Sequence, residues 1–156
     1  MKLGLISDTH GNVPNAVHAA LAGVDSILHA GDVGPIDVIT ELEAIAPVHA
    51  VLGNTDYGIT LPVTRLEEFG GRTILIHHIV DVDFPSQTVR ELLSTEKPEI
   101  VVFGHTHMPF DELRSRIRFI NPGSACQPRG GTAPSVAILE LSGETPTLQS
   151  IALQES

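Results

Sequence analysis

The sequence predicts an α/β protein that forms a single domain over residues 1–156. Three features support this prediction: short apolar runs alternate with helical patterns in the first third, these runs stop at glycine-containing polar loops, and later runs pair across turns. Such alternation favours parallel strands joined by right-handed crossovers, with their carboxyl ends at one edge of the sheet. A chain of 156 residues is long enough to bury a core without cross-links.

The first third of the chain repeats a unit of strand and polar loop, and a helix follows the first two strands. The expected strands are Leu3–Ser7, Ser26–His29 and Val48–Leu52. A potential ligand follows each strand: Asp8 after the first, Asp32 after the second and Asn54 after the third. Pro14 and Pro35 stand near the first turns of the two helices, whose apolar residues recur at helical spacing. We therefore expect the three polar side chains to converge at one sheet edge.

The later part of the chain predicts antiparallel pairs around one further helix and strand. The expected pairs are 64–69 with 72–76, 110–114 with 117–120, and 135–141 with 147–153. The first pair ends at His77 and His78. A helix closes before Pro98, and an apolar strand over Ile100–Phe103 leads into Gly104–His107. Imidazoles therefore follow two more strands.

Composition excludes several classes of function. Nine Lys and Arg residues against nineteen Asp and Glu residues give a formal net charge of −10. This balance argues against a broad nucleic-acid surface and against anionic membranes, whereas a small phosphate-bearing ligand fits if metal supplies positive charge locally. The single cysteine, Cys126, excludes an internal disulfide and is expected to be a packed residue. No stretch resembles a signal peptide or a membrane span, so we expect a cytoplasmic protein.

Polar side chains at or just after the strand ends share the ability to bind metal ions. They are Asp8, His10, Asp32, Asn54, His77, His105 and His107. Carboxylate, carboxamide and imidazole groups without a thiolate suit Mn²⁺, Fe, Zn²⁺ or Ni²⁺. The set is too large for one ion, but it suits two ions that share a carboxylate and keep positions open for water and substrate. We therefore expect two divalent metal ions, with manganese as the first choice.

Five short motifs follow one another along the chain. They are Asp-x-His at 8–10, Gly-Asp at 31–32, Gly-Asn at 53–54, a strand-end His, and Gly-His-x-His at 104–107. In this order they resemble the calcineurin-like metallophosphoesterases. The short chain, with Ile6–Asn12, Gly53–Asp56 and Asn121–Ser124, is similar to the small bacterial and archaeal phosphodiesterases of that superfamily. The resemblance spans essentially the whole chain and implies a sandwich of two β-sheets flanked by helices.

The resemblance also implies a role for each side chain. Asp8, His10 and His107 would hold one ion, Asn54, His77 and His105 the other, and Asp32 would bridge them. It implies hydrolysis of a phosphodiester by a hydroxide that bridges the ions, with Asp32, Asn54 and His77 as the catalytic ligands. Successive strand residues face opposite sides, so only one of His77 and His78 can point into the site, and the sequence leaves open which one does.

Three further features lie near these ligands. Many superfamily members carry a His after the Gly-Asn pair that protonates the leaving group, whereas this chain has Thr55. The turn over Asn121–Ser124 is either only a turn or a phosphate-binding element; its candidate residues are Asn121, Gly123, Ser124 and Arg129. His29 is either a packed strand residue or a partner behind the ligands.

The expected function is hydrolysis of a small phosphodiester substrate. The alternatives are a phosphomonoesterase with the same centre and a non-catalytic scaffold of the same fold. Comparing rates on a diester and a monoester distinguishes the phosphodiesterase from the phosphomonoesterase. The complete ligand set argues against the scaffold. The physiological substrate, the native metal and the formation of a homo-oligomer are left open by the sequence.

Overall fold

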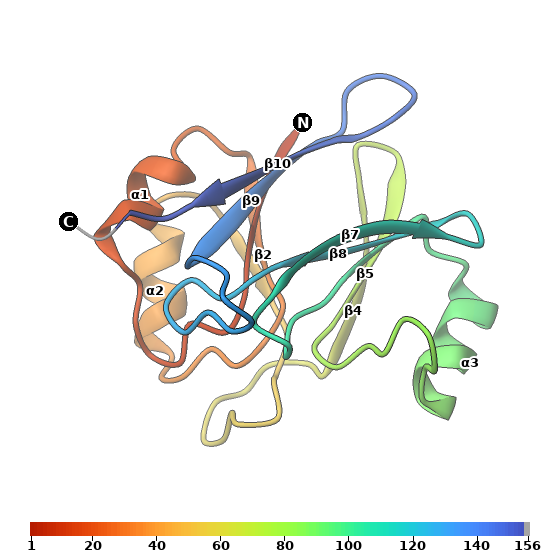
Figure 1. Cartoon of the computed structure of the whole chain (residues 1–156), viewed down its shortest axis with the longest axis horizontal. Helices are drawn as coiled ribbons and strands as arrows, with labels where there is room; N and C mark the ends of the chain where they lie inside the picture. The colour runs from red at the N-terminus through yellow and green to blue at the C-terminus, as the bar shows by residue number, and fades with distance from the viewer. Residues whose placement is uncertain (155–156) are drawn as a thin grey trace.

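Two five-stranded mixed sheets face each other in the computed structural model, which describes residues 1–154 (Figure 1). In spatial order, the first sheet contains β10 (Thr147–Ala152), β9 (Ser135–Glu140), β1 (Lys2–Ile6), β2 (Ser26–His29) and β3 (Val48–Ala50). The second contains β4 (Thr64–Phe69), β5 (Arg72–His77), β6 (Ile100–Val102), β8 (Ile117–Pro122) and β7 (Pro109–Arg114). β1, β2 and β3 run parallel, as do β5, β6 and β8, and the other pairs are antiparallel.

The space between the sheets is filled by alternate residues of the central strands. Leu5 of β1 belongs to the same buried cluster as Ile74 and Ile76 of β5. Because side chains alternate along a strand, Ile6 and Leu75 lie on the two outer faces and pack in separate clusters. The sandwich of two sheets that the resemblance implied is therefore confirmed.

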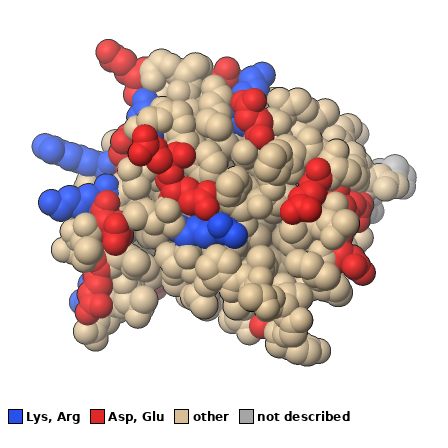
Figure 2. Space-filling model, turned by 180° about the vertical axis from the view of Figure 1, so that it is seen from behind, with Lys and Arg blue, Asp and Glu red and all other residues tan. Residues whose placement is uncertain are grey.

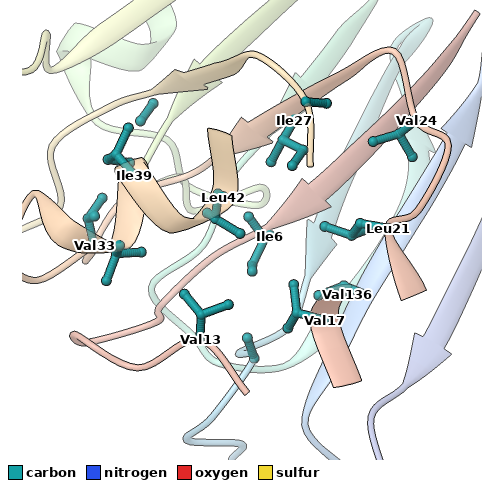
Figure 3. Packing of buried hydrophobic residues seen from close by; sticks show 14 of the residues in the cluster. Ile6, Val13, Val17, Leu21, Val24, Ile27, Val33, Ile39, Leu42 and Val136 are labelled. Atoms are coloured by element: carbon teal, nitrogen blue, oxygen red, sulfur yellow. The ribbon is translucent and has the colours of Figure 1, made fainter. Parts of the chain in front are cut away.

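Helices cover the outer faces of the sandwich. They are α1 (Asn15–Ala20), α2 (Asp37–Glu43) and α3 (Gln87–Glu96). Val17 of α1 and Leu42 of α2 pack with Ile6 over the first sheet (Figure 3). Val89 of α3 packs with Leu75 on the second sheet, at the opposite side of the molecule (Figure 1). The order of layers is thus helices, sheet, sheet, helix.

The predicted elements are all present, with shifts of a few residues at some ends. The helices, the two hairpins and the closing antiparallel pair are found. Ser115 and Arg116, between β7 and β8, both have positive φ, as a tight two-residue hairpin turn requires. Within the described part of the chain, no helix is long and apolar enough to cross a membrane. The loops after β1, β2, β3, β5 and β6 meet at one end of the sandwich, and they carry the polar residues described next.

Candidate metal centre

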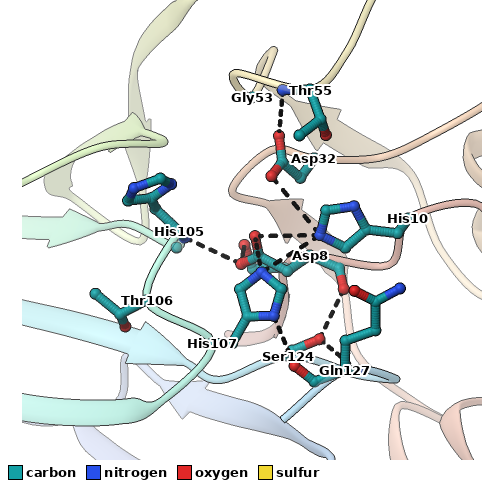
Figure 4. Close-up of polar contacts among 12 residues, drawn as sticks. Asp8, His10, Asp32, Gly53, Thr55, His105, Thr106, His107, Ser124 and Gln127 are labelled. Carbon is teal, nitrogen blue, oxygen red and sulfur yellow. Dashed lines mark hydrogen bonds and ion pairs between the residues drawn. The ribbon is translucent and has the colours of Figure 1, made fainter. Parts of the chain in front are cut away.

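The loops after β1 and β6 bring Asp8, His10 and His107 together (Figure 4). Oδ1 of Asp8 lies 3.2 Å from Nε2 of His107 and 3.9 Å from Nε2 of His10. The two imidazole Nε2 atoms are 3.3 Å apart. Asp8 and His107 are buried, whereas His10 is half-buried. These three residues form the first half of the site.

Oδ1 of Asp8 is buried without a hydrogen-bond donor, and within residues 1–154 no other buried side-chain nitrogen or oxygen is in this condition. Its partner oxygen Oδ2 accepts from Oγ of Ser7 at 2.7 Å and from the backbone N–H of His105 at 3.1 Å. A buried, unpaired carboxylate oxygen is costly unless a cation neutralises it. Four residues each place one potential ligand atom within 4.8 Å of those of the other three. They are Asp8, His10, Asp32 and His107. The donor set therefore fits a metal ion.

Asp32 connects this half of the site to a second group of donors. Its Oδ2 lies 3.7 Å from Nε2 of His10 and 3.3 Å from Nε2 of His78. Oδ1 of Asn54 lies 3.0 Å from Nε2 of His78 and 3.1 Å from Nδ1 of His105. One carboxylate thus faces both halves, which is the arrangement that a bridging ligand needs.

His78, and not His77, enters the site at the end of β5. His78 continues the inward series of Ile74 and Ile76, and it is only 3 % exposed. His77 faces the other way, and its Nδ1 lies 2.8 Å from Oγ1 of Thr64 on β4. The expectation that His77 is a ligand is therefore corrected. Alternation along the strand predicted that only one of the two could enter, but the sequence did not show which face of β5 points inward.

Five of the site residues adopt left-handed backbone conformations. The φ angles are 54° at Asp8, 46° at His10, 55° at Asp32, 74° at His105 and 60° at His107. Asp and His tolerate this region better than most side chains, but each such residue still stores strain. The candidate ligands are therefore presented by sharp bends just beyond the strands. The sheets and the contacts behind the loops must hold these bends in place.

Glycines make room for the two carboxylates. A Cβ on Gly53 would collide with Oδ1 of Asp32. A Cβ on Gly104 would collide with Oγ of Ser7 and would lie 2.7 Å from Oδ2 of Asp8. The glycine in each motif is therefore required because a neighbouring loop fills the space that a side chain would take.

Backbone carbonyls orient two of the imidazoles. Nδ1 of His78 lies 2.7 Å from the carbonyl oxygen of Ala30, and Nδ1 of His107 lies 2.6 Å from that of Gln127. A carbonyl can only accept, so in the neutral rings the hydrogen is on Nδ1 and the lone pair is on Nε2. Both Nε2 atoms face the centre in the form that binds metal. Sequence analysis missed these partners because they are main-chain atoms.

Asp56 ties the loop after β2 to the loop after β3. Its Oδ2 accepts from the backbone N–H groups of Val33 at 3.0 Å and Gly53 at 2.9 Å, and its Oδ1 accepts from that of Gly34 at 3.0 Å. Sequence analysis did not predict this structural role, although Asp56 ends the Gly53–Asp56 segment. Its carboxylate holds two ligand-bearing loops in register and is occupied by main-chain donors.

The surroundings of Asp32 and His105 favour their ligand forms. Burial alone would raise the pKa of the Asp32 carboxyl, but hydrogen bonds from Thr55 and the nearby His78 imidazole hold that pKa below its ordinary value. Burial, together with the nearby His78 imidazole, lowers the pKa of His105. At neutral pH the centre therefore offers an ionised Asp32 carboxylate and a neutral His105 imidazole.

The turn at the end of β8 supports the ligand loops and does not present a phosphate cradle. Nδ2 of Asn121 donates to the carbonyl of Gly104 at 3.0 Å, and Oγ of Ser124 donates to that of Asp8 at 2.7 Å. The N–H of Gly123 donates to Oδ1 of Asn121 at 2.9 Å. These groups are buried and occupied. Of the two alternatives for Asn121–Ser124, the structure supports the turn, and the prediction of phosphate binding by Asn121, Gly123 and Ser124 is corrected.

Arg129 lies beside the centre. Its backbone N–H donates to the carbonyl of His107 at 3.2 Å, its side chain is exposed, and its charge contributes to the electrostatic surroundings of His105. Of the four residues predicted to contact phosphate, Arg129 is the one whose polar side chain faces solvent.

His29 is a buried partner behind the site. Its Nδ1 accepts from the N–H of Gly31 at 3.1 Å, and its Nε2 donates to Oγ1 of Thr9 at 3.0 Å. Oγ1 of Thr9 donates in turn to the carbonyl of Val33 at 2.7 Å. Burial lowers the pKa of His29 to about 3. A neutral His29 therefore links the loops after β1 and β2.

Comparison with known protein families agrees with this geometry. The calcineurin-like phosphoesterase superfamily domain matches residues 1–144. The chain therefore belongs to this superfamily of metallophosphoesterases.

Individual proteins resemble the chain over most of its length. A probable metallophosphoesterase of Methanothermobacter thermautotrophicus is 42% identical, covering 92% of this chain and 88% of the relative. A phosphodiesterase of Methanocaldococcus jannaschii is 30% identical, covering 90% of this chain and 93% of the relative. The structure of vacuolar protein sorting 29 from Cryptosporidium parvum matches with a TM-score of 0.83 at 22% identity, covering 99% of this chain and 92% of that one. This last likeness shows the fold alone.

Proposed function

We propose that this chain is a phosphodiesterase that requires two divalent metal ions. The observation that carries the proposal is the position of Asp32 Oδ2 between His10 and His78, beside the unpaired Oδ1 of Asp8. Two groups of donors that share one carboxylate suit two cations better than one. The family and the relatives named metallophosphoesterase and phosphodiesterase support the same function.

The proposal assigns each donor to one half of the centre. Asp8, His10 and His107 would hold one ion, Asn54, His78 and His105 would hold the other, and Asp32 would serve both. When bound, the ions would act as Lewis acids on the phosphate oxygens and lower the pKa of the water that attacks phosphorus. The donors are oxygen and imidazole groups without a thiolate, a set that suits Mn²⁺, Fe, Ni²⁺ or Zn²⁺, and manganese is the first ion to test.

The half of the centre near Asn54 is the side at which phosphate enters. Asn54 is exposed and His105 is half-buried, whereas Asp8 lies beneath them. The guanidinium of Arg129 would hold a phosphate oxygen at this side. Thr55 offers no imidazole, so the leaving oxygen departs without a strong side-chain acid at that position.

The distribution of charge favours a small substrate. On the face seen in Figure 2, basic side chains lie beside acidic ones and form no continuous patch. The formal net charge of −10 would repel a polyanion. A short diester with a single charged phosphate avoids most of this repulsion.

Metal analysis and a comparison of two substrates test the proposal. Protein purified without chelator is expected to contain two divalent ions per chain and to hydrolyse bis(p-nitrophenyl) phosphate faster than p-nitrophenyl phosphate with Mn²⁺. Asp32→Asn should abolish this activity, whereas Glu43→Gln, an exposed change on α2, should not. A faster monoester reaction would identify a phosphomonoesterase. Lack of hydrolysis with Mn²⁺, Ni²⁺, Fe²⁺ and Zn²⁺ would favour a scaffold.

A further inference from the structure

We propose that Ile79 and the apolar groove beside it bind the uncharged organic group that a diester substrate keeps on phosphorus. This inference rests on the proposed function. The groove has a volume of about 600 Å³, and its apolar side chains include Val80, Val82, Phe103 and Phe110. The rings of Phe103 and Phe110 meet edge to face, with centroids 5.9 Å apart.

The groove is continuous with the metal centre. Gly104, His105 and Thr106 form part of its lining, and they belong to the loop that carries two proposed ligands. Nδ1 of His105 lies 3.1 Å from Oδ1 of Asn54. A phosphate held near Asn54 and His105 would therefore carry one of its ester groups into the groove.

A second, smaller pocket shares Ile79 with the groove. It has a volume of about 240 Å³, and its lining includes Asn54, Val63 and His78. Ile79 lines both cavities and is 45 % exposed. A diester has two organic groups and a monoester has one. Ile79 thus borders two places in which the two groups of a diester can lie.

The polar rim of the groove selects against a second negative charge. Asp81 and Asp83 contribute to its lining. Oδ1 of Asp83 pairs with Arg114 at 2.6 Å, and Oδ1 of Asp81 accepts the N–H groups of Asp83 and Phe84. The rim therefore presents two carboxylates, and its one nearby guanidinium, that of Arg114, is already paired, so an anionic tail would be repelled. An aryl or other uncharged apolar group would instead cover exposed apolar surface.

Exposed apolar side chains in this region support the assignment of a ligand. Met108 also lines the groove and is 41 % exposed. Together, Ile79 and Met108 present apolar surface to water at the mouth of a polar centre. Clefts that are mainly apolar, with a few polar groups to orient the ligand, are typical of small-molecule sites.

The test compares two diesters with the same leaving group. Bis(p-nitrophenyl) phosphate and methyl p-nitrophenyl phosphate share a leaving group and differ in the group that stays on phosphorus. A change in their rate ratio on mutation of the groove therefore reports contact with that group. The wild-type protein with Mn²⁺ should prefer the bis-aryl substrate in kcat/KM by about tenfold or more, the effect of added apolar contact. Ile79→Ser should remove most of that preference. Leu113→Ser, which changes a 69 % exposed apolar residue on β7 outside both cavities, should keep it.

A binding measurement separates the groove from the chemistry. Titration calorimetry of the Mn²⁺-loaded protein should show tighter binding of phenylphosphonate than of methylphosphonate, and Ile79→Ser should reduce the difference. Val82→Ser, which changes another residue lining the groove, should act in the same direction. Thermal unfolding checks that the variants are folded.

Each outcome bears on a different statement. If the wild-type protein hydrolyses diesters but Ile79→Ser and Val82→Ser leave both preferences unchanged, the groove is not the binding site. A second outcome is that no diester is hydrolysed, yet phenylphosphonate binds better than methylphosphonate and Ile79→Ser reduces the difference. This result would support the groove as a binding site and contradict the proposed reaction. Equal binding of the two phosphonates by the wild-type protein would overturn the groove.

Discussion

The backbone N–H of Thr55 donates to Oδ1 of Asp32 across 2.9 Å, which leaves Oδ2 as the oxygen that faces His10 and His78. The orientation of the proposed bridging carboxylate therefore depends on a main-chain group. A side-chain change at position 55 can keep this hydrogen bond. Position 55 is thus a place where the chemistry of the leaving group can be tested without removing a ligand.

Thr55→His is expected to help poor leaving groups more than good ones. General acid catalysis contributes about 10² to 10⁴-fold where it operates, mainly for unstable leaving anions. In the wild-type protein, kcat/KM should fall steeply as the pKa of the leaving alcohol rises, and the variant should show a shallower slope. A shallow slope in the wild-type protein would mean that another residue already acts as the acid.

Asp32→Asn is expected to weaken both metal positions, whereas His107→Ala should mainly empty one. A bridging carboxylate contributes charge to two cations, and a terminal imidazole contributes to one. Metal analysis after dialysis measures this directly. Retention of two ions per chain by both variants would contradict the ligand assignment.

His78→Ala is expected to remove metal from the second half of the centre and to abolish activity, whereas His77→Ala should retain most of both. The reason is the inward position of His78, whose Nε2 lies 3.3 Å from Oδ2 of Asp32, while His77 contacts Thr64. Metal content and diester hydrolysis are the measurements. The opposite ranking of the two variants would restore His77 as the ligand.

Asp56→Asn is expected to lower both stability and metal affinity. Its carboxylate accepts three backbone N–H groups, and an amide would turn one donor toward them. Loss of charge-assisted hydrogen bonds in a partly buried site costs on the order of 2 to 4 kcal/mol. Urea unfolding with chelator present measures the stability, and Mn²⁺ titration measures the affinity. Glu43→Gln serves as the control. If Asp56→Asn keeps the wild-type free energy of unfolding and Mn²⁺ affinity, the Asp56 carboxylate is not needed to hold the two loops together.

His29 is expected to make stability depend on pH below neutrality. Burial lowers its folded pKa from 6.5 to about 3, so the stability is fully present above about pH 6.5 and falls as pH drops toward 3. In that window one proton taken up on unfolding gives a slope of about 1.4 kcal/mol per pH unit. Unfolding of the metal-free protein between pH 7 and pH 4.5 should show a shallower slope for His29→Gln. Identical slopes would mean that His29 is protonated in the folded state.

Much of the fold could be predicted because local patterns and global topology agree. The alternation of strand and helix in the first third predicted the parallel strands, and the paired runs over 64–69 and 72–76 predicted the first hairpin. That alternation also predicted that Asp8, Asp32 and Asn54 would converge. The sandwich itself came from the family resemblance, because periodicity does not show how two sheets stack.

The errors at the site have a shared physical cause, which is that sequence does not show where a polar group finds its partner. Asn121 and Ser124 have the right chemistry for phosphate, but main-chain carbonyls of the ligand loops use their donors. His77 and His78 have the same chemistry and differ only in the face of β5 they occupy. Asp56 was overlooked as a structural residue because its partners are backbone amides contributed by two loops.

The left-handed bends at the ligands link metal binding to the evolution of the fold. His10 and His105 are only half-buried, so neither side chain is needed to fill the core. Glycine at either position would remove a proposed ligand and at the same time relieve the steric cost of a positive φ. A single substitution of this kind at either position would therefore remove a proposed metal-binding side chain and stabilise the fold. In a relative that is no longer under selection for catalysis, such substitutions would remove metal-binding side chains without disrupting the two-sheet sandwich. The same fold would then persist without catalytic activity.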